Sequence, residues 1–133
     1  MRAALRLNDH YHGTPPIWRR PDLLADGEMA FRAGRFYEAR ELWEAEGLTA
    51  RGTERGWITG LAQVATGFLK CDESSYSVAE RFLFRGLHAL HAAPDRVRTV
   101  DAATLRAAAE QLLVALRRGD PADARALAAA PAA

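Results

Sequence analysis

A chain of 133 residues fits one domain, and a hydrophobic fraction of 49% is ordinary for a globular protein with one core. Lys and Arg together number 18 and Asp and Glu 17, so the chain lacks the excess of positive charge with which proteins bind a nucleic-acid backbone. No stretch approaches the roughly 20 apolar residues that cross a bilayer. We therefore expect neither nucleic acid nor a membrane as a partner.

The first 21 residues are interrupted by a glycine and three prolines, which resist helix formation. We predict an irregular N-terminal arm over residues 1–21, with Ile17 and Trp18 as the apolar side chains that hold it to the domain. A single helical domain is expected to follow over residues 22–130.

Three helices are predicted in the first half of this domain. Asp22 can cap the first helix, and Gly34 can take the left-handed conformation that closes it. The second is expected over residues 36–47, where Phe36, Ala39, Trp43 and Gly47 form one apolar stripe at helical spacing. The third, over residues 54–70, is apolar around most of its circumference and should be central and buried.

The second half of the domain continues the helical pattern. A fourth helix is expected over residues 77–92, with Ser77 and Glu80 as a capping box or with Ser74 or Ser75 as an earlier cap. Asp101 should open a fifth helix and Asp120, followed by proline, a short sixth. Since no segment alternates between apolar and polar β-branched residues, we predict an all-α fold without strands.

Two motifs on the second and third predicted helices occur in a fixed order and spacing. The first comprises Gly34, Phe36, Glu38, Ala39 and Glu41, followed by Trp43 and Glu44, and the second comprises Gly60, Leu61, Gln63 and Ala65. Together they resemble a widespread prokaryotic family known only as domain of unknown function 309, over about residues 28–90. The resemblance implies a compact, mainly antiparallel bundle of five to six helices, and it implies no established biochemical role.

The chain departs from this family at Arg40, where the family usually has histidine. Arg40 lies at the border of the apolar stripe, with Glu44 one turn further on. The favoured interpretation is a structural ion pair between the two, with the stem of Arg40 covering Trp43. The alternative is a polar pocket between the second and third helices that suits a carboxylate or a phosphate, lined by Arg40, Glu41, Glu44, Gln63 and Thr59.

The third predicted helix carries one narrow polar strip, which bears on this choice. Thr59, Gln63, Thr66 and Lys70 follow one another at helical spacing. They form either the exposed face of an otherwise covered helix or one wall of the pocket.

Other chemistry-bearing residues give weaker signals. Glu41 and Glu44 could hold a hard cation only with a ligand from another helix, so we expect no metal and no cofactor. His88 and His91 are expected at the surface. Cys71, the single cysteine, is expected as a turn-side thiol without a neighbouring base, and because it has no disulfide partner we expect the cytoplasm.

The sequence leaves three hypotheses open on function. The first is a small helical binding or interaction module, because the first two helices resemble a tetratricopeptide hairpin without its fixed period. The second is an enzyme for a small anionic substrate, with Arg40 orienting it and Glu41 or Glu44 as acid or base. The third is homodimerisation through Phe84 and Tyr76.

Overall fold

The computed structural model describes residues 22–129 and residue 131 and confirms the all-α prediction for this part of the chain. The elements are α2 (Leu23–Arg32), α3 (Phe36–Gly47), α4 (Gly52–Asp72), α5 (Tyr76–Leu90), β1 (Arg96–Val97), β2 (Val100–Asp101), α6 (Ala102–Arg117) and α7 (Pro121–Ala129). The predicted arm over residues 1–21, with Ile17 and Trp18, lies outside the described residues. None of the helices described is both long and apolar enough to cross a membrane.

Local sequence signals fix the helix ends. The carboxylate of Asp22 accepts a hydrogen bond from the amide of Ala25 at 3.1 Å, as an N-cap does. Gly34 has φ +81°, and the amide of Arg35 donates to the carbonyl of Ala30 at 2.8 Å, which closes α2 in a Schellman motif. The sharp turn at Gly34 starts α3 at Phe36, at the predicted residue.

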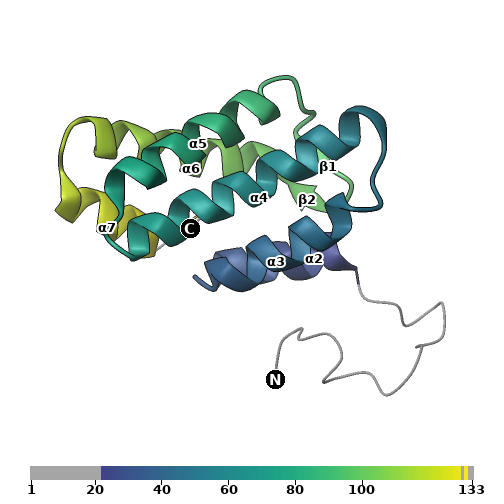
Figure 1. The fold of residues 1–133 in the computed structure, drawn as a ribbon, viewed down its shortest axis with the longest axis horizontal. Helices are drawn as coiled ribbons and strands as arrows, with labels where there is room; N and C mark the ends of the chain where they lie inside the picture. Colours follow the sequence, from purple (N-terminus) through teal and green to yellow (C-terminus); the bar gives the residue numbers. More distant parts are fainter. Residues whose placement is uncertain (1–21, 130, 132–133) are drawn as a thin grey trace, which may run out of the picture.

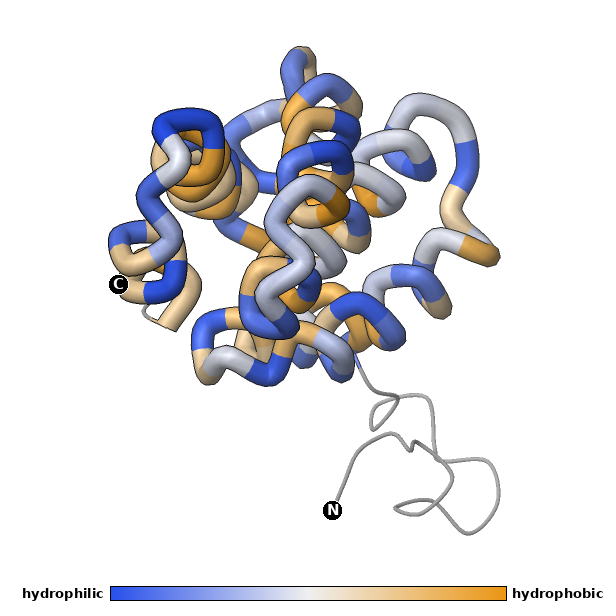
Figure 2. The backbone as a smooth tube through the Cα atoms, turned by 60° about the vertical axis from the view of Figure 1, so that its left-hand side comes forward, coloured by the Kyte–Doolittle hydropathy of each residue, from blue (hydrophilic) through white to orange (hydrophobic). Residues whose placement is uncertain are grey.

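The helices are arranged around α4, which packs against α3 on one side and α5 on the other. In Figure 1, α2 lies beside α3, whereas α6 lies behind α5 and contacts α7. Hydrophobic and hydrophilic residues alternate along each helix in Figure 2, as expected of helices that bury one face.

Contacts along the helix pairs show that successive helices from α2 to α5 run antiparallel. An aromatic cluster joins the first three of them, with ring centroids 5.3 Å apart for Phe31 and Phe36 and 4.9 Å apart for Phe31 and Phe68. At the far end of the α2–α3 pair, the indole N–H of Trp43 donates to the carbonyl of Leu24 at 3.1 Å. Trp43 is fully buried, so its one polar atom has the partner that burial requires.

Glycines let α4 and α5 approach one another closely. A Cβ atom placed on Gly60 would lie 2.9 Å from the Cβ of Ala89 and 3.2 Å from the carbonyl oxygen of Gly86. A Cβ on Gly86 would in turn meet the carbonyl oxygen of Gly60 at 2.9 Å. The α4–α5 contact therefore depends on the absence of both side chains, which accounts for the glycine at this position of the second motif.

The prediction of a domain without strands was wrong for a short connection between α5 and α6. β1 and β2 pair antiparallel, with Arg96 opposite Asp101 and Val97 opposite Val100. Both valines are buried, so the hairpin closes one end of the core. Two-residue strands are too short to show the alternation by which strands are recognised.

Three smaller expectations also need correction. The capping box of Ser77 and Glu80 is not formed. The alternative position is the one observed, since α5 begins at Tyr76 with Ser75 as the N-cap, although the Ser75 side chain makes no capping hydrogen bond. Cys71 belongs to the last turn of α4 and is fully buried, so it is not a turn-side thiol. Tyr76 was expected to contribute to a dimer surface, but it is half-buried against the core and accepts a hydrogen bond from Arg125.

Candidate functional site

Two neighbouring hollows follow the polar strip of α4. The first, of about 660 Å³, lies between α3 and α4 and is also lined by Phe82 of α5. The second, of about 580 Å³, lies between α4 and α5. Arg55, Thr59 and Gln63 line both. The two hollows therefore form one trough along α4, which we call the α4 groove.

The α3 wall of the groove is acidic. It includes Glu41, Glu44 and Leu48, all of them exposed to solvent. The other two glutamates of α3 are neutralised, since Glu38 pairs with Arg35 at 3.0 Å and Glu46 pairs with Arg98 at 2.8 Å. Glu41 and Glu44 form no ion pair within the described residues, and so the groove has two carboxylates free to meet a partner.

The α5 wall is aromatic and basic. It is built from Phe82, Phe84, Arg85 and His88. The guanidinium carbon of Arg85 lies 5.6 Å from the ring centre of Phe82, and the ring of Phe84 stacks on His88 with centroids 6.5 Å apart. Phe84 keeps 54% of its surface exposed. The wall thus offers an apolar surface beside a cation.

The floor of the groove is formed by side chains of α4. Thr66 is buried, and its hydroxyl donates to the carbonyl of Ala62 one turn earlier at 2.8 Å. Gln63 is half-buried and Thr59 is exposed. Lys70, the last member of the predicted strip, lines neither hollow and pairs with Glu73 at 3.1 Å. The strip is therefore a groove floor from Thr59 to Thr66 and an ordinary surface beyond it.

The structure brings together four of the five predicted pocket residues, and the exception is Arg40. Glu41, Glu44, Thr59 and Gln63 all line the first hollow. Arg40 lines neither hollow, and its guanidinium carbon lies 4.9 Å from the ring centre of Tyr37. The predicted ion pair with Glu44 is also absent from the described residues. The Nε of Arg40 is buried without a hydrogen-bond partner within the described residues.

Arg55 supplies the guanidinium that the prediction assigned to Arg40. It lines both hollows and forms no ion pair within the part of the chain that the structure describes. Arg55 lies four residues before Thr59 and therefore on the same helical face. The sequence pattern would have identified it if the polar strip had been followed one turn further toward the N-terminus. Phe82, Arg85 and His88 had no such signal, because their nearness to α4 depends on how α5 packs.

Nothing in the described residues assembles a metal site or an activated thiol. No three His, Cys, Asp or Glu side chains of residues 22–129 gather around one point where an ion could bind. Burial raises the pKa of the Cys71 thiol above its ordinary value, which favours the protonated form.

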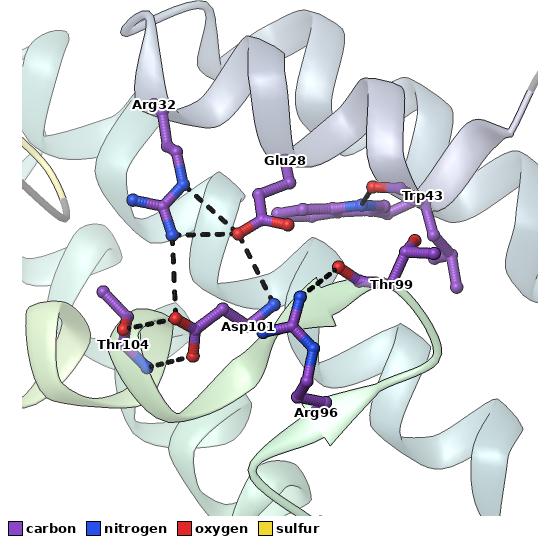
Figure 3. Close-up of polar contacts among 8 residues, drawn as sticks. Glu28, Arg32, Trp43, Arg96, Thr99, Asp101 and Thr104 are labelled. Atoms are coloured by element: carbon purple, nitrogen blue, oxygen red, sulfur yellow. Dashed lines mark hydrogen bonds and ion pairs between the residues drawn. The ribbon is translucent and has the colours of Figure 1, made fainter.

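A second polar cluster lies away from the groove and ties α2 to the hairpin and to α6, as Figure 3 shows. Nη2 of Arg32 donates to Oε2 of Glu28 at 2.9 Å, and the amide of Asp101 donates to the same oxygen at 3.4 Å. Hydrogen bonds from Thr104 lower the pKa of the Asp101 carboxyl. Asp101 also caps α6 by accepting from the Thr104 amide, so this cluster is structural.

Comparison with known proteins bears on the part of the chain that forms the groove. Residues 24–82 match the family model described as Domain of unknown function (DUF309), which confirms the resemblance seen in the two motifs. The match includes the acidic wall, the floor and Phe82, whereas Phe84, Arg85 and His88 follow it. No curated protein matches the chain, and no solved structure matches it.

Proposed function

We propose that this chain is an interaction module that binds a polypeptide segment of a partner protein in the α4 groove. The observation that carries the proposal is the trough itself, in which two hollows share Arg55, Thr59 and Gln63. Glu41, Glu44, Arg55 and Arg85 form no ion pair within the described residues, whereas the neighbouring glutamates of α3 do.

The shape of the groove favours an elongated ligand. Arg55 and Thr66 are eleven residues apart on α4, which corresponds to roughly 17 Å at the helical rise. Sites for small molecules usually enclose most of the ligand surface. The α4 groove is open along one side, because Glu41, Glu44 and Thr59 on its walls and floor are exposed, and a polypeptide segment can extend along such a surface.

The enzyme hypothesis finds less support. It assigned Arg40 to orient an anionic substrate, but Arg40 lies over Tyr37 and outside the groove. The two candidate acid or base groups, Glu41 and Glu44, are exposed to solvent, whereas sites for small molecules usually enclose most of the ligand surface.

The proposed compartment is the cytoplasm of a prokaryotic cell. Cys71 is a buried free thiol, which suits a reducing environment. The prokaryotic source is proposed from the resemblance to the family.

Selection from a library of displayed random peptides tests the proposal. Peptides of about 16 residues are long enough to follow the groove even as a helix, and they would be selected on the full chain. Thr59→Trp places a bulky ring at the residue that both hollows share. We expect the selected peptides to lose most of their affinity for this variant, as measured by fluorescence anisotropy.

Gln111→Trp on α6 is the matched control, because Gln111 is an exposed helical residue that lines a different hollow. The selected peptides should bind this variant as they bind the unmodified chain. Peptides that bind Thr59→Trp with undiminished affinity, or a selection that enriches no peptide, would show that the α4 groove is not a binding site for polypeptide.

A further inference from the structure

The two sides of the α4 groove differ in the sign of their charges, and Arg55 lies between them. The α3 side carries the carboxylates of Glu41 and Glu44, whereas the guanidinium groups come from Arg55 on the floor and Arg85 on the α5 side. None of these four forms an ion pair within residues 22–129. Outside the groove some charges of the same helices are paired, as Glu80 of α5 is with Arg117 at 3.1 Å.

This separation restricts what can cover the groove. An exposed charge is well solvated by water, but a charge that a partner covers without pairing loses its hydration at a cost. A partner that fits must therefore place basic groups over Glu41 and Glu44 and acidic groups over Arg55 and Arg85. A segment with one sign of charge along its whole length would repel one side of the groove.

The floor and the walls suit a helix better than an extended strand. Gly56, Thr59 and Ala62 are small and follow one another at helical spacing, which allows another helix to approach within the usual 8–10 Å of α4. Leu48 and Phe84 are exposed by 78% and 54% on opposite sides. The aliphatic stems of long charged side chains can cover such surfaces while their charged ends reach the opposite charges.

We infer that the ligand of the α4 groove is an amphipathic helix of a partner protein, with Lys or Arg along one edge and Asp or Glu along the other. An apolar stripe between the two edges faces Thr59 and its small neighbours. The inference rests on the proposed function and deepens it. Because the two edges differ in charge, they also determine the direction in which the helix lies.

Three synthetic helical peptides with the same apolar stripe test the inference. One carries Lys on one edge and Glu on the other, the second carries Glu on both edges and the third carries Lys on both. We expect the mixed-edge peptide to bind the full chain about tenfold more tightly than either of the others, as a few exposed ion pairs can produce. Equal binding of all three would overturn the inference.

Charge reversal on α3 provides the decisive comparison. In the double variant Glu41→Lys and Glu44→Lys, both sides of the groove are basic, so the peptide with Glu on both edges should become the tightest ligand. The control is Asp72→Lys with Glu110→Lys, which makes the same change of net charge at exposed residues that line neither hollow of the groove. An unchanged order of peptides in the α3 variant, or the same reordering in the control, would contradict the assignment.

Two further measurements separate the helix from other occupants. Circular dichroism should show helix forming in the mixed-edge peptide when it binds, and binding without added helix would overturn the inference. Light scattering of the chain alone should show one species that the α3 double variant leaves unchanged in mass. A dimer that this variant separates would mean that a second copy occupies the groove.

Failure of this inference can be told apart from failure of the proposed function. The selected peptides could lose affinity for Thr59→Trp and yet bind the Glu41→Lys and Glu44→Lys double variant as tightly as the unmodified chain. This result would support the groove as a polypeptide site and contradict the charged helix. A selection that enriches nothing would reject both.

Discussion

Arg98 shows how a single side chain holds three elements together. Its φ of 51° lies in the left-handed region, which is unfavourable for a residue with a Cβ atom. From this position in the β1–β2 turn, its guanidinium donates to Glu46 of α3 at 2.8 Å and to Glu54 of α4 at 2.8 and 3.2 Å. These hydrogen bonds raise the pKa of Arg98 above its ordinary value, so it stays charged.

Two substitutions of Arg98 should distinguish the effect of its ion pairs on stability from the effect of its backbone conformation. Arg98→Ala removes the ion pairs but retains a Cβ in the left-handed region, and we expect a loss of about 1 kcal/mol in the free energy of unfolding, as for a favourable exposed pair. Arg98→Gly should lose less, because glycine adopts this φ freely. Urea unfolding measures both, with the exposed Arg51→Ala as the control, and equal stability of the Arg98→Ala and Arg51→Ala proteins would refute the role.

The contact between Arg98 and Glu54 predicts how the stability of the fold changes with pH. The hydrogen bond from Arg98 lowers the pKa of the Glu54 carboxyl below its ordinary value of 4.5. A carboxyl whose pKa is lower in the folded state stabilises the fold above its unfolded pKa, and this contribution is lost as the pH falls through the folded pKa. The stability gap between the unmodified chain and Arg98→Ala should therefore be full at neutral pH and shrink below about pH 4.5. A gap that stays constant in urea titrations from neutral to acidic pH would contradict this.

At the scale of whole elements, the residues of the two family motifs are explained by packing. Gly34 makes the left-handed turn between α2 and α3, and Phe36 joins the aromatic cluster. Trp43 packs where Gly27 has no side chain, since a Cβ on Gly27 would clash with the indole ring. Gly60 permits the contact with α5. These motif positions therefore define the fold, and they do not by themselves identify a reaction.

The α4–α5 contact predicts opposite effects for two substitutions in one helix. Gly60→Ala forces its new methyl group against Ala89 and the backbone of Gly86, and overpacking of this kind costs about 1–3 kcal/mol. Gly56→Ala meets nothing within 4 Å, so its better helix propensity should stabilise the protein by about 0.5–1 kcal/mol. Thermal unfolding followed by circular dichroism measures both shifts. A stabilised Gly60→Ala protein would mean that α4 and α5 can separate without cost.

The helices could be predicted from the sequence because their signals are local. Asp22, Gly34 and Asp101 act at the helix ends through their own side chain or backbone, and α3 has the predicted bounds. The β1–β2 hairpin could not be predicted, since its stability comes from the burial of Val97 and Val100 against distant residues.

The candidate site could be predicted only in part, for a related reason. Periodicity placed Glu44, Thr59 and Gln63 on the correct faces of their helices, and the structure brings them together. Periodicity also placed Arg40 beside Glu44, but the direction in which a long side chain extends depends on its neighbours, and Arg40 extends over Tyr37. The α5 wall depends on the crossing of α4 and α5, which a helical wheel of one segment does not contain.

The molecule as a whole is organised around α4. Ten of the 21 residues of α4 are buried, and it contacts α3, α5, α6 and α7. The α2–α3 pair packs on one side of it, and α5 with α6 covers the other. The groove lies on the one face of α4 that these helices leave uncovered. Its floor therefore belongs to the helix with the largest buried share among those described. We expect this floor to stay rigid when a ligand binds.

This arrangement predicts a gradient of local stability across the molecule. The amides of α4 can exchange with solvent only when the packing on several sides opens, so their exchange should require global unfolding. The helix α7 buries only Ala124 and Ala128, and its amides should exchange at least about tenfold faster. Hydrogen exchange followed by mass spectrometry measures both helices in one experiment. Gly60→Ala should accelerate exchange in α4 and α5 while leaving the rate in α7 nearly unchanged, because α7 opens locally. Protection in α7 equal to that in α4 would show that the domain opens as one unit and that α4 is not its most stable part.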